Sequence, residues 1–292
     1  MIPSVALRGR AEAEASRLPP LLARAEHLAG TVLLGDHGRR RAGLGDDFWQ
    51  YRPAQSGDSR RMIDHRRSAR GDAQFVRERE WQIAQSVMMW VDQGASMRFS
   101  SAPEKLETKA ARARLLGLAT AILLVRGGER VGLTGTKLPP RRGNAQILRL
   151  AEAFSLDDSA EYSPPEHRAM IPHARAVFIS DFLGDMAEVE LALTKAADRG
   201  VRGVVLQVLD PVEEEFPFHG RTIFESMGGG MVHETLKANE LRQKYIDRLA
   251  ERRDMIERLC AATGWQMGLH HTSQSAQSAL LWIYRALDGG TI

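Results

Sequence analysis

The sequence has few cysteines and few aromatic residues, and it contains no long apolar run. Its single cysteine, Cys260, excludes an intrachain disulfide framework and a zinc knuckle of paired cysteines, which favours a reducing compartment. The longest apolar stretch, 115–125, is shorter than the roughly 20 residues that cross a bilayer, and the first residues lack the apolar core of a signal peptide. We therefore expect a cytoplasmic protein without a membrane span.

The motifs of nucleotide-binding and serine-dependent enzymes are also missing. The sequence has no G-x-x-x-x-G-K-[ST] loop, no G-x-G-x-x-G between a strand and a helix, and no G-x-S-x-G turn. Without a backbone loop that cradles phosphates, the chain is not expected to bind or hydrolyse ATP. No catalytic residues are predicted, and a non-enzymatic role is favoured.

Positive charge is concentrated near the N-terminus. The net charge is only +3, yet residues 39–79 hold eleven arginines against six acidic residues. This segment is interpreted either as a solvated, ion-paired surface or as a basic face for an acidic protein or a nucleic acid. Aromatic residues make up only 6% of the chain and interleave poorly with the arginines, so stacking platforms for nucleic acid are lacking.

From residue 86 onward, apolar strands alternate with amphipathic helices. Strands are predicted at 86–92, 130–136, 175–181, 201–210 and 265–271, and helices at 105–128, 144–154, 186–200, 236–262 and 273–287. The strands are apolar on both faces, which is typical of a mostly parallel sheet covered by helices on both sides. The pattern predicts an α/β three-layer sandwich with a Rossmann-like sheet.

The remaining segments show weaker patterns. We expect residues 1–80 to form a helical and arginine-rich segment packed on a core domain of residues 81–292. Within it, 9–16 and 20–29 have helical spacing, 30–72 resembles a long structured loop, and 73–80 alternates as a strand does. Residues 210–235 are predicted to be an irregular insert.

Two predicted strands end in aspartate, Asp92 and Asp181. Ligands of open parallel sheets bind at the carboxyl ends of the strands, where the strand order reverses. If the order is of Rossmann type, with the first and fourth strands adjacent, these carboxylates share one crevice. Together with Ser96 and Asn144 they supply the hard oxygen ligands that suit Mg²⁺. The alternative is that each aspartate only caps the next helix.

Two blocks of the sequence resemble a known bacterial family. In "SGDSRRMIDHRRSARG" (56–71), eight residues match a family signature, and "VLDPVEEEFPFHG" (208–220) matches a second block through Asp210 and Pro211. The matching residues of the first block are Gly57, Asp58, Arg61, Ile63, Asp64, Ser68, Ala69 and Arg70, whereas Ser59 and His65 depart from it. The chain is similar here to the family called domain of unknown function 58, whose members resemble von Willebrand factor A domains.

The resemblance implies a fold, a partner and a site. It implies a von Willebrand factor A-type sandwich, no defined catalytic activity, and an adaptor role with a MoxR-type AAA+ ATPase in assembling or activating a protein complex. It also implies a degenerate metal-ion-dependent adhesion site, because Gly94 stands where the motif has its first serine and Asn144 where it has threonine. The resemblance therefore implies either weak Mg²⁺ binding through Asp92, Ser96, Asn144 and Asp181 or an empty site, in which Asp92 closes a strand at a partner-binding face.

Two alternatives stay open at this point. One is a metal-dependent hydrolase that uses Asp92 and Asp181, and the other is a nucleic-acid-binding protein that uses the arginine-rich segment. Asp58 and Asp64 are interpreted as structural, because arginine–carboxylate pairs can pin a loop with little apolar content. His270 and His271 are adjacent strand residues and point to opposite faces, so they are not expected to share one ion.

Overall fold

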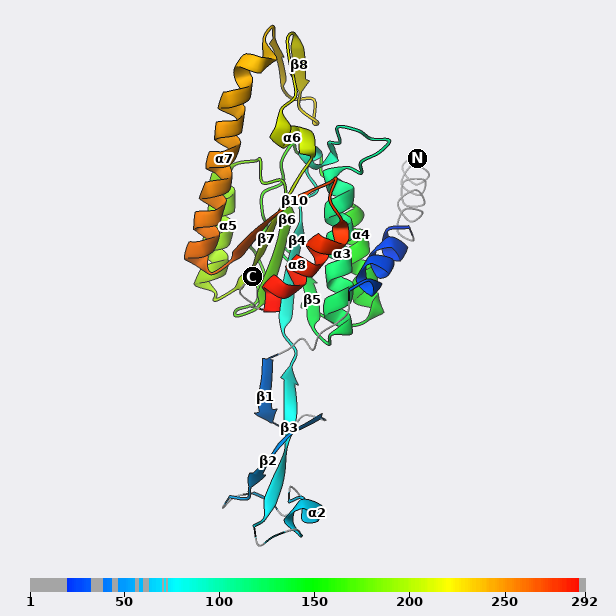
Figure 1. Ribbon diagram of the computed structural model, residues 1–292, viewed down its shortest axis with the longest axis vertical. Helices are drawn as coiled ribbons and strands as arrows, with labels where there is room; N and C mark the ends of the chain where they lie inside the picture. Colours follow the sequence, from blue (N-terminus) through cyan, green and yellow to red (C-terminus); the bar gives the residue numbers. More distant parts are fainter. Residues whose placement is uncertain are drawn as a thin grey trace, which may run out of the picture. The chain divides into compact units, whose positions relative to one another are not determined.

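The computed structural model describes residues 20–32, 39–43, 47–55, 58–59, 63–69, 71 and 73–288 (Figure 1). Contacts within the chain divide it into two compact units, one of residues 36–85 and one of residues 1–35 with 86–292. The division therefore places the helical residues 20–30 in the larger unit, and it falls five residues after the boundary expected from the sequence.

The larger unit is built on a parallel sheet of five strands. The strands are β4 (Ser86–Val91), β5 (Arg130–Leu133), β6 (Arg175–Ser180), β7 (Arg202–Leu209) and β10 (Gln266–His271). Their order across the sheet is β10-β7-β6-β4-β5, and all four pairings are parallel. Strand β4 thus lies between β5 and β6, the second and third strands of this sheet along the chain, whereas a Rossmann-type order would place the second and fourth strands beside it.

Helices cover both faces of this sheet. One face carries α3 (Lys109–Arg126), α4 (Asn144–Ser155), α8 (Ala276–Asp288) and the helical residues 20–30, and the other carries α5 (Met186–Asp198) and α7 (Ala238–Thr263). Successive β4 side chains alternate between the two cores, with Met89 in the first and Met88 in the second. The predicted α/β three-layer sandwich is confirmed.

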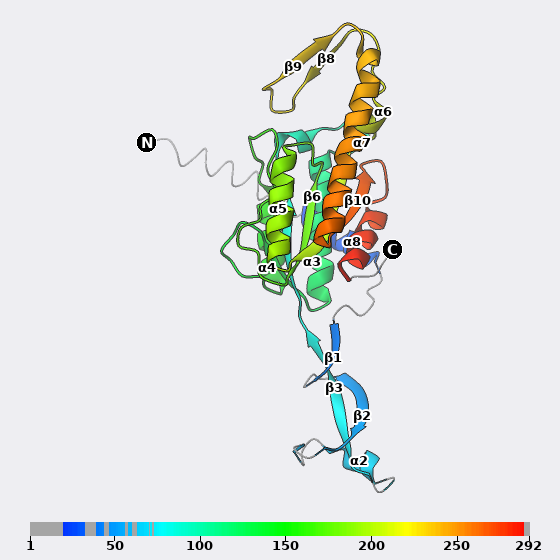
Figure 2. The ribbon, with the colours of Figure 1, turned by 90° about the vertical axis from the view of Figure 1, so that its left-hand side faces the viewer.

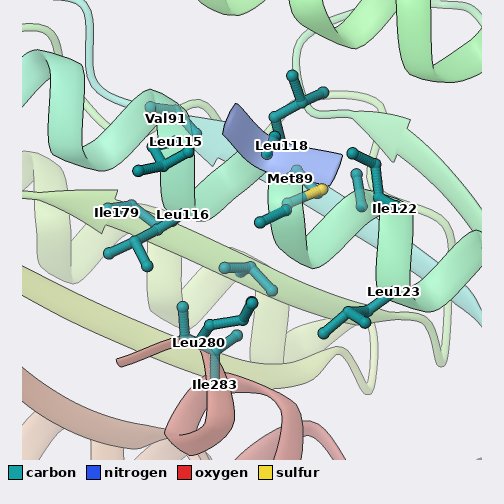
Figure 3. Close-up of a cluster of buried hydrophobic side chains, with 14 of the residues drawn as sticks. Met89, Val91, Leu115, Leu116, Leu118, Ile122, Leu123, Ile179, Leu280 and Ile283 are labelled. Carbon is teal, nitrogen blue, oxygen red and sulfur yellow. The ribbon is translucent and has the colours of Figure 1, made fainter. Parts of the chain in front are cut away.

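Helix α3 lies at the centre of the first core. Thr108 caps its start by accepting a hydrogen bond from the Ala111 amide, and Gly127 follows its last turn. Its leucines and isoleucine pack between β4, β6 and α8, as Figure 3 shows for Leu116, Ile179 and Leu280. This packing accounts for the apolar run at 115–125. No helix among the described residues is both long enough and apolar enough to cross a membrane.

The segment after β7 is more regular than expected. A short helix, α6 (Pro211–Glu215), is followed by an antiparallel hairpin of β8 (Thr222–Glu225) and β9 (Val232–Thr235). The prediction of an irregular insert is wrong here. The sequence did not reveal the two strands because they have only four residues each and no clear alternation of apolar and polar residues. Figure 2 shows the hairpin beside the N-terminal end of α7, away from the parallel sheet.

The smaller unit is a three-stranded antiparallel sheet. Its strands β1 (Arg39–Gly43), β2 (Asp47–Pro53) and β3 (Phe75–Ile83) lie in the order β1-β3-β2, with the short helix α2 (His65–Ser68) between β2 and β3 in the chain. The strand expected at 73–80 corresponds to β3. The long loop expected at 30–72 instead contains β1, β2 and α2. The sequence did not reveal these elements because the many arginines of this stretch leave no clear apolar periodicity.

Candidate functional site

Asp92 and Asp181 follow neighbouring strands at the carboxyl end of the parallel sheet. Strand β4 pairs with β6, and the Asp92 amide donates to the Ile179 carbonyl at 2.9 Å. The helices that follow these two strands, α3 and α5, cover opposite faces, so the strand order reverses between β4 and β6. Both aspartates are buried at this switch point, where the sequence placed them.

Each carboxylate oxygen of the two aspartates already accepts a hydrogen bond. Asp92 accepts from the Gly94 amide at 2.8 Å and from the Ser180 hydroxyl at 2.6 Å. Asp181 accepts from the Leu183 amide at 3.0 Å and from the ammonium group of Lys109 at 2.8 Å. Burial, with the nearby Asp181 carboxylate as a second cause, raises the pKa of Asp92 to about 6.

Lys109 is the residue that the sequence-based prediction missed. It is the first residue of α3 and is 1% exposed, and its ammonium group lies 2.8 Å from Asp181 and 2.5 Å from Glu213. Burial alone would lower the pKa of Lys109, but the two carboxylates outweigh burial and raise it. A lysine at a helix N-terminus opposes the helix dipole, and this mismatch is the signal that could have pointed to a buried carboxylate partner.

The second family block holds Glu213 against Lys109. Asp210 caps α6 and Pro211 takes the first helical position, where its missing N–H is not needed. One oxygen of Glu213 accepts from the Asp210 amide at 2.8 Å, which completes a capping box, and the other accepts from Lys109. Asp210 also accepts from the Ser101 amide at 2.9 Å, so the motif joins α6 to the segment before α3.

The other two predicted metal ligands do not complete a site. The Ser96 hydroxyl is buried without a hydrogen-bond partner, and Asn144 is exposed at the start of α4. The second residue after Asn144, Gln146, bonds the Val131 carbonyl of β5, whereas Ala153 near the end of α4 accepts from Gln93 beside Asp92. A helix of this length spans about 18 Å, so Asn144 lies at the opposite end of the sheet from the aspartates.

The arrangement therefore does not fit a divalent cation. The carboxylate oxygens are all engaged, and an ammonium group lies against Asp181 where a metal would bind. Within the described part of the chain, no group of three or more His, Cys, Asp or Glu side chains is placed to hold a metal ion. A metal-dependent hydrolase would need these carboxylates to be open to the ion.

The loss of the motif's first serine has a steric cause. A Cβ atom on Gly94 would lie 2.9 Å from both the Glu161 carbonyl oxygen and the Ser163 nitrogen, closer than such atoms approach. The chain at 160–163 is held there because the Ala95 and Ser96 amides donate to the Ala160 and Glu161 carbonyls. Only glycine fits beneath this loop.

A pocket opens beside Asp92. It has a volume of about 460 Å³ and is bounded by the aromatic rings of Trp90, Tyr162 and Phe182. Four acidic residues are among those that line it, Asp92, Glu161, Asp185 and Glu188, and its lining residues include no lysine, arginine or histidine. This chemistry favours a cationic group over an anionic one.

The first family block has local structural roles where it is described. Asp64 caps α2 by accepting from the Arg67 amide at 2.9 Å, and Asp58 accepts from the Gln55 amide at 2.7 Å. The Ser68 hydroxyl donates to the Asp64 carbonyl and accepts from the Phe75 amide, which ties α2 to β3. The matching residues Gly57, Arg61 and Arg70 lie outside the described residues.

The histidine pair and the cysteine have separate surroundings. The His270 ring contacts the Arg112 guanidinium and the His271 ring contacts Glu214, so the two rings do not converge on one site. Cys260 is buried in the second core, and burial raises the pKa of its thiol to about 12. Neither feature resembles a metal or nucleophile site.

The fold and this site define a class: an α/β three-layer sandwich with two buried aspartates at the switch point of a parallel sheet. More narrowly, the chain belongs to the family described as protein of unknown function DUF58, whose profile matches residues 50–255. The family match thus covers the smaller unit from residue 50 onward and most of the larger unit.

The chain is similar to proteins from mycobacteria and to solved structures from Bacteroides species. Uncharacterized protein Mb1516 of Mycobacterium bovis and uncharacterized protein Rv1480 of Mycobacterium tuberculosis are each 28% identical over 249 residues, covering 80% of this chain and 77% of theirs. Among solved structures, an aerotolerance-related membrane protein from Bacteroides fragilis is 18% identical with a TM-score of 0.41, and BatB from Bacteroides thetaiotaomicron is 16% identical with a TM-score of 0.39. Each match covers 71% of this chain and 100% of the other.

Proposed function

We propose that this protein is a non-enzymatic, protein-binding adaptor that works with a MoxR-type AAA+ ATPase in assembling or activating a protein complex. The observation that carries the proposal is a set of exposed apolar residues on the β8–β9 hairpin and next to β9, called here the hairpin patch. Its members are large apolar residues that are between 59% and 72% exposed: Ile223, Met231, Val232 and Leu236. Apolar residues gathered on an exposed surface mark sites of protein contact.

The hairpin is held firmly enough to present this patch. Phe216, Phe218 and Phe224 contact one another, with ring centroids 5.1–5.7 Å apart, and Phe216 lies 4.9 Å from the Tyr245 ring of α7. Aromatic pairs of this kind add to the stability that burial provides. A patch on a supported hairpin loses less conformational entropy on binding than one on a loose loop.

The choice of partner rests on the family resemblance and on the missing nucleotide site. The resemblance to the family implies a link with MoxR-type AAA+ ATPases, and the sequence of this chain has no phosphate-binding loop motif of its own. In the proposed pair, the ATPase supplies nucleotide hydrolysis and this chain supplies contacts to the ATPase and to a client complex.

The proposal is tested by titrating the purified chain with the MoxR-type ATPase of the same organism, with ADP and with a slowly hydrolysed ATP analogue, in a calorimeter. We expect saturable binding that weakens at least about tenfold in the variant Met231→Ser/Val232→Ser/Leu236→Ser, since a tenfold change is about 1.4 kcal/mol. The control is Leu138→Ser/Leu156→Ser, which removes two leucines that are each 57% exposed away from the hairpin. Absence of binding in both nucleotide states, or equal loss in both variants, contradicts the proposal.

A further inference from the structure

We propose that the ammonium group of Lys109 takes the place of a divalent metal ion at the carboxyl end of the sheet. The structure of this edge of the sheet then does not need a bound metal ion. The inference begins from charge. Asp92, Asp181 and Glu213 bring three buried or nearly buried carboxylates to one region, and Lys109 is the cation that contacts two of them. Buried carboxylates need a paired cation or a coordinated metal.

The geometry leaves no room for both cations. The ammonium group donates to Asp181 at 2.8 Å and to Glu213 at 2.5 Å, and the remaining oxygens of these two side chains accept from the Leu183 and Asp210 amides. A divalent ion bound to Asp181 would lie within a few ångströms of Lys109. At such distances in a buried setting, the repulsion between the two cations opposes binding of the ion.

Lys109 also joins parts of the chain that are distant in sequence. It lies 72 residues from Asp181 and 104 residues from Glu213, so it holds α3, the end of β6 and α6 together. Helix α6 leads directly into the segment that carries the β8–β9 hairpin. Lys109 is part of the chain, whereas a metal ion must be taken up from solution. The position of α6 therefore does not depend on the supply or removal of a metal ion.

The matched variants Lys109→Ala and Lys109→Met test this inference. Both remove the ammonium group, but alanine leaves space between Asp181 and Glu213, whereas methionine fills most of it with a side chain that does not bind hard cations. We expect both variants to melt lower than the wild type by on the order of 10 °C, because a buried charge network loses one partner. The control is Lys195→Ala, which removes an exposed lysine that pairs with Asp198 at 3.8 Å, and it should melt as the wild type does.

Mn²⁺ is the probe for the vacated position, followed by electron paramagnetic resonance and by thermal melting with and without 1 mM of the ion. We expect no bound Mn²⁺ and no shift in melting temperature for the wild type. We expect Lys109→Ala to bind one Mn²⁺ and to recover part of its lost melting temperature, and Lys109→Met to do neither. If Lys109→Ala folds only when Mn²⁺ is present, that result also supports the inference.

Wild-type protein that binds one Mn²⁺ below 1 mM and loses it on Asp181→Asn substitution would overturn the inference. So would a Lys109→Ala variant that melts with the wild type, or one that melts lower but does not respond to Mn²⁺. The wild-type titration decides the matter even if neither Lys109 variant yields folded protein. All of these measurements are independent of the proposed ATPase partner.

Discussion

The Arg112 guanidinium of α3 lies 2.7 Å from the Nε2 atom of His270 at the end of β10, and both side chains are buried. A guanidinium group can only donate, so Nε2 is the acceptor and the imidazole is neutral, with its proton on Nδ1. Arg112 also donates to the Thr272 and Gln274 carbonyls. The Arg112 side chain of α3 therefore binds residues at and just after the end of β10, and it sets the protonation state of His270.

This contact predicts a loss of stability at mildly acidic pH. Burial, and next the Arg112 and His271 charges, lower the pKa of His270 to about 4, and Glu107 opposes this only in part. The unfolded chain then binds more protons than the folded chain between about pH 6.5 and 4, so stability falls as the pH falls through this window. The contribution is about 3 kcal/mol at most, from 1.36 kcal/mol per pKa unit.

Urea denaturation of the wild type and of His270→Gln at a series of pH values from 4 to 7.5 measures this effect. Glutamine can still accept from Arg112 but does not titrate, so the advantage of the wild type over the variant should shrink steadily below pH 6.5. The exposed His233→Gln is the control and should leave the pH profile unchanged. A constant difference between wild type and His270→Gln across the series would contradict the assignment.

The sequence predicted the parallel sheet because apolar periodicity is local, and it predicted the meeting of Asp92 and Asp181 because the carboxyl ends of parallel strands share one edge. It did not predict Lys109, since the partners of this residue are set by the packing of α3 and α6 rather than by nearby sequence. Asn144 was misplaced for a related reason. The chain after β5 first runs back along it, with Arg141 bridged to Val131, before α4 begins.

Asp64 in the first family block provides a test of local capping. Asp64→Ala should destabilise the smaller unit by about 1 kcal/mol, the usual effect of losing an N-cap, because the Arg67 amide loses its acceptor. Asp64→Asn should behave much as the wild type, since asparagine is an equally good cap. Hydrogen exchange of residues 63–76 gives the measurement. If the asparagine variant exchanges as fast as the alanine variant, the carboxylate charge and not the cap is the important feature.

The missing phosphate loop predicts that the purified chain has no ATPase activity of its own. Phosphate release with Mg²⁺ and ATP should match a blank without protein, both for the wild type and for Asp92→Asn. In a mixture with the MoxR-type ATPase, any turnover should follow the concentration of the ATPase. Turnover that follows the peak of this chain through a second purification and falls in Asp92→Asn would show that the chain is an enzyme.

Gly94→Ser restores the serine that the von Willebrand factor A motif has at this position, and we expect it to destabilise the protein rather than to create a metal site. Its Cβ would meet the Glu161 carbonyl oxygen and the Ser163 nitrogen at 2.9 Å, so the loop above must move. Overpacking of this kind costs about 1–3 kcal/mol. Gly94→Ala should cost about the same because the clash arises at Cβ, whereas Gly230→Ser, where a Cβ has open space, should cost little. Thermal melting with and without Mg²⁺ gives the comparison. A Gly94→Ser variant that is as stable as the wild type and is further stabilised by Mg²⁺ would mean that the loop yields easily and that glycine alone keeps the metal out.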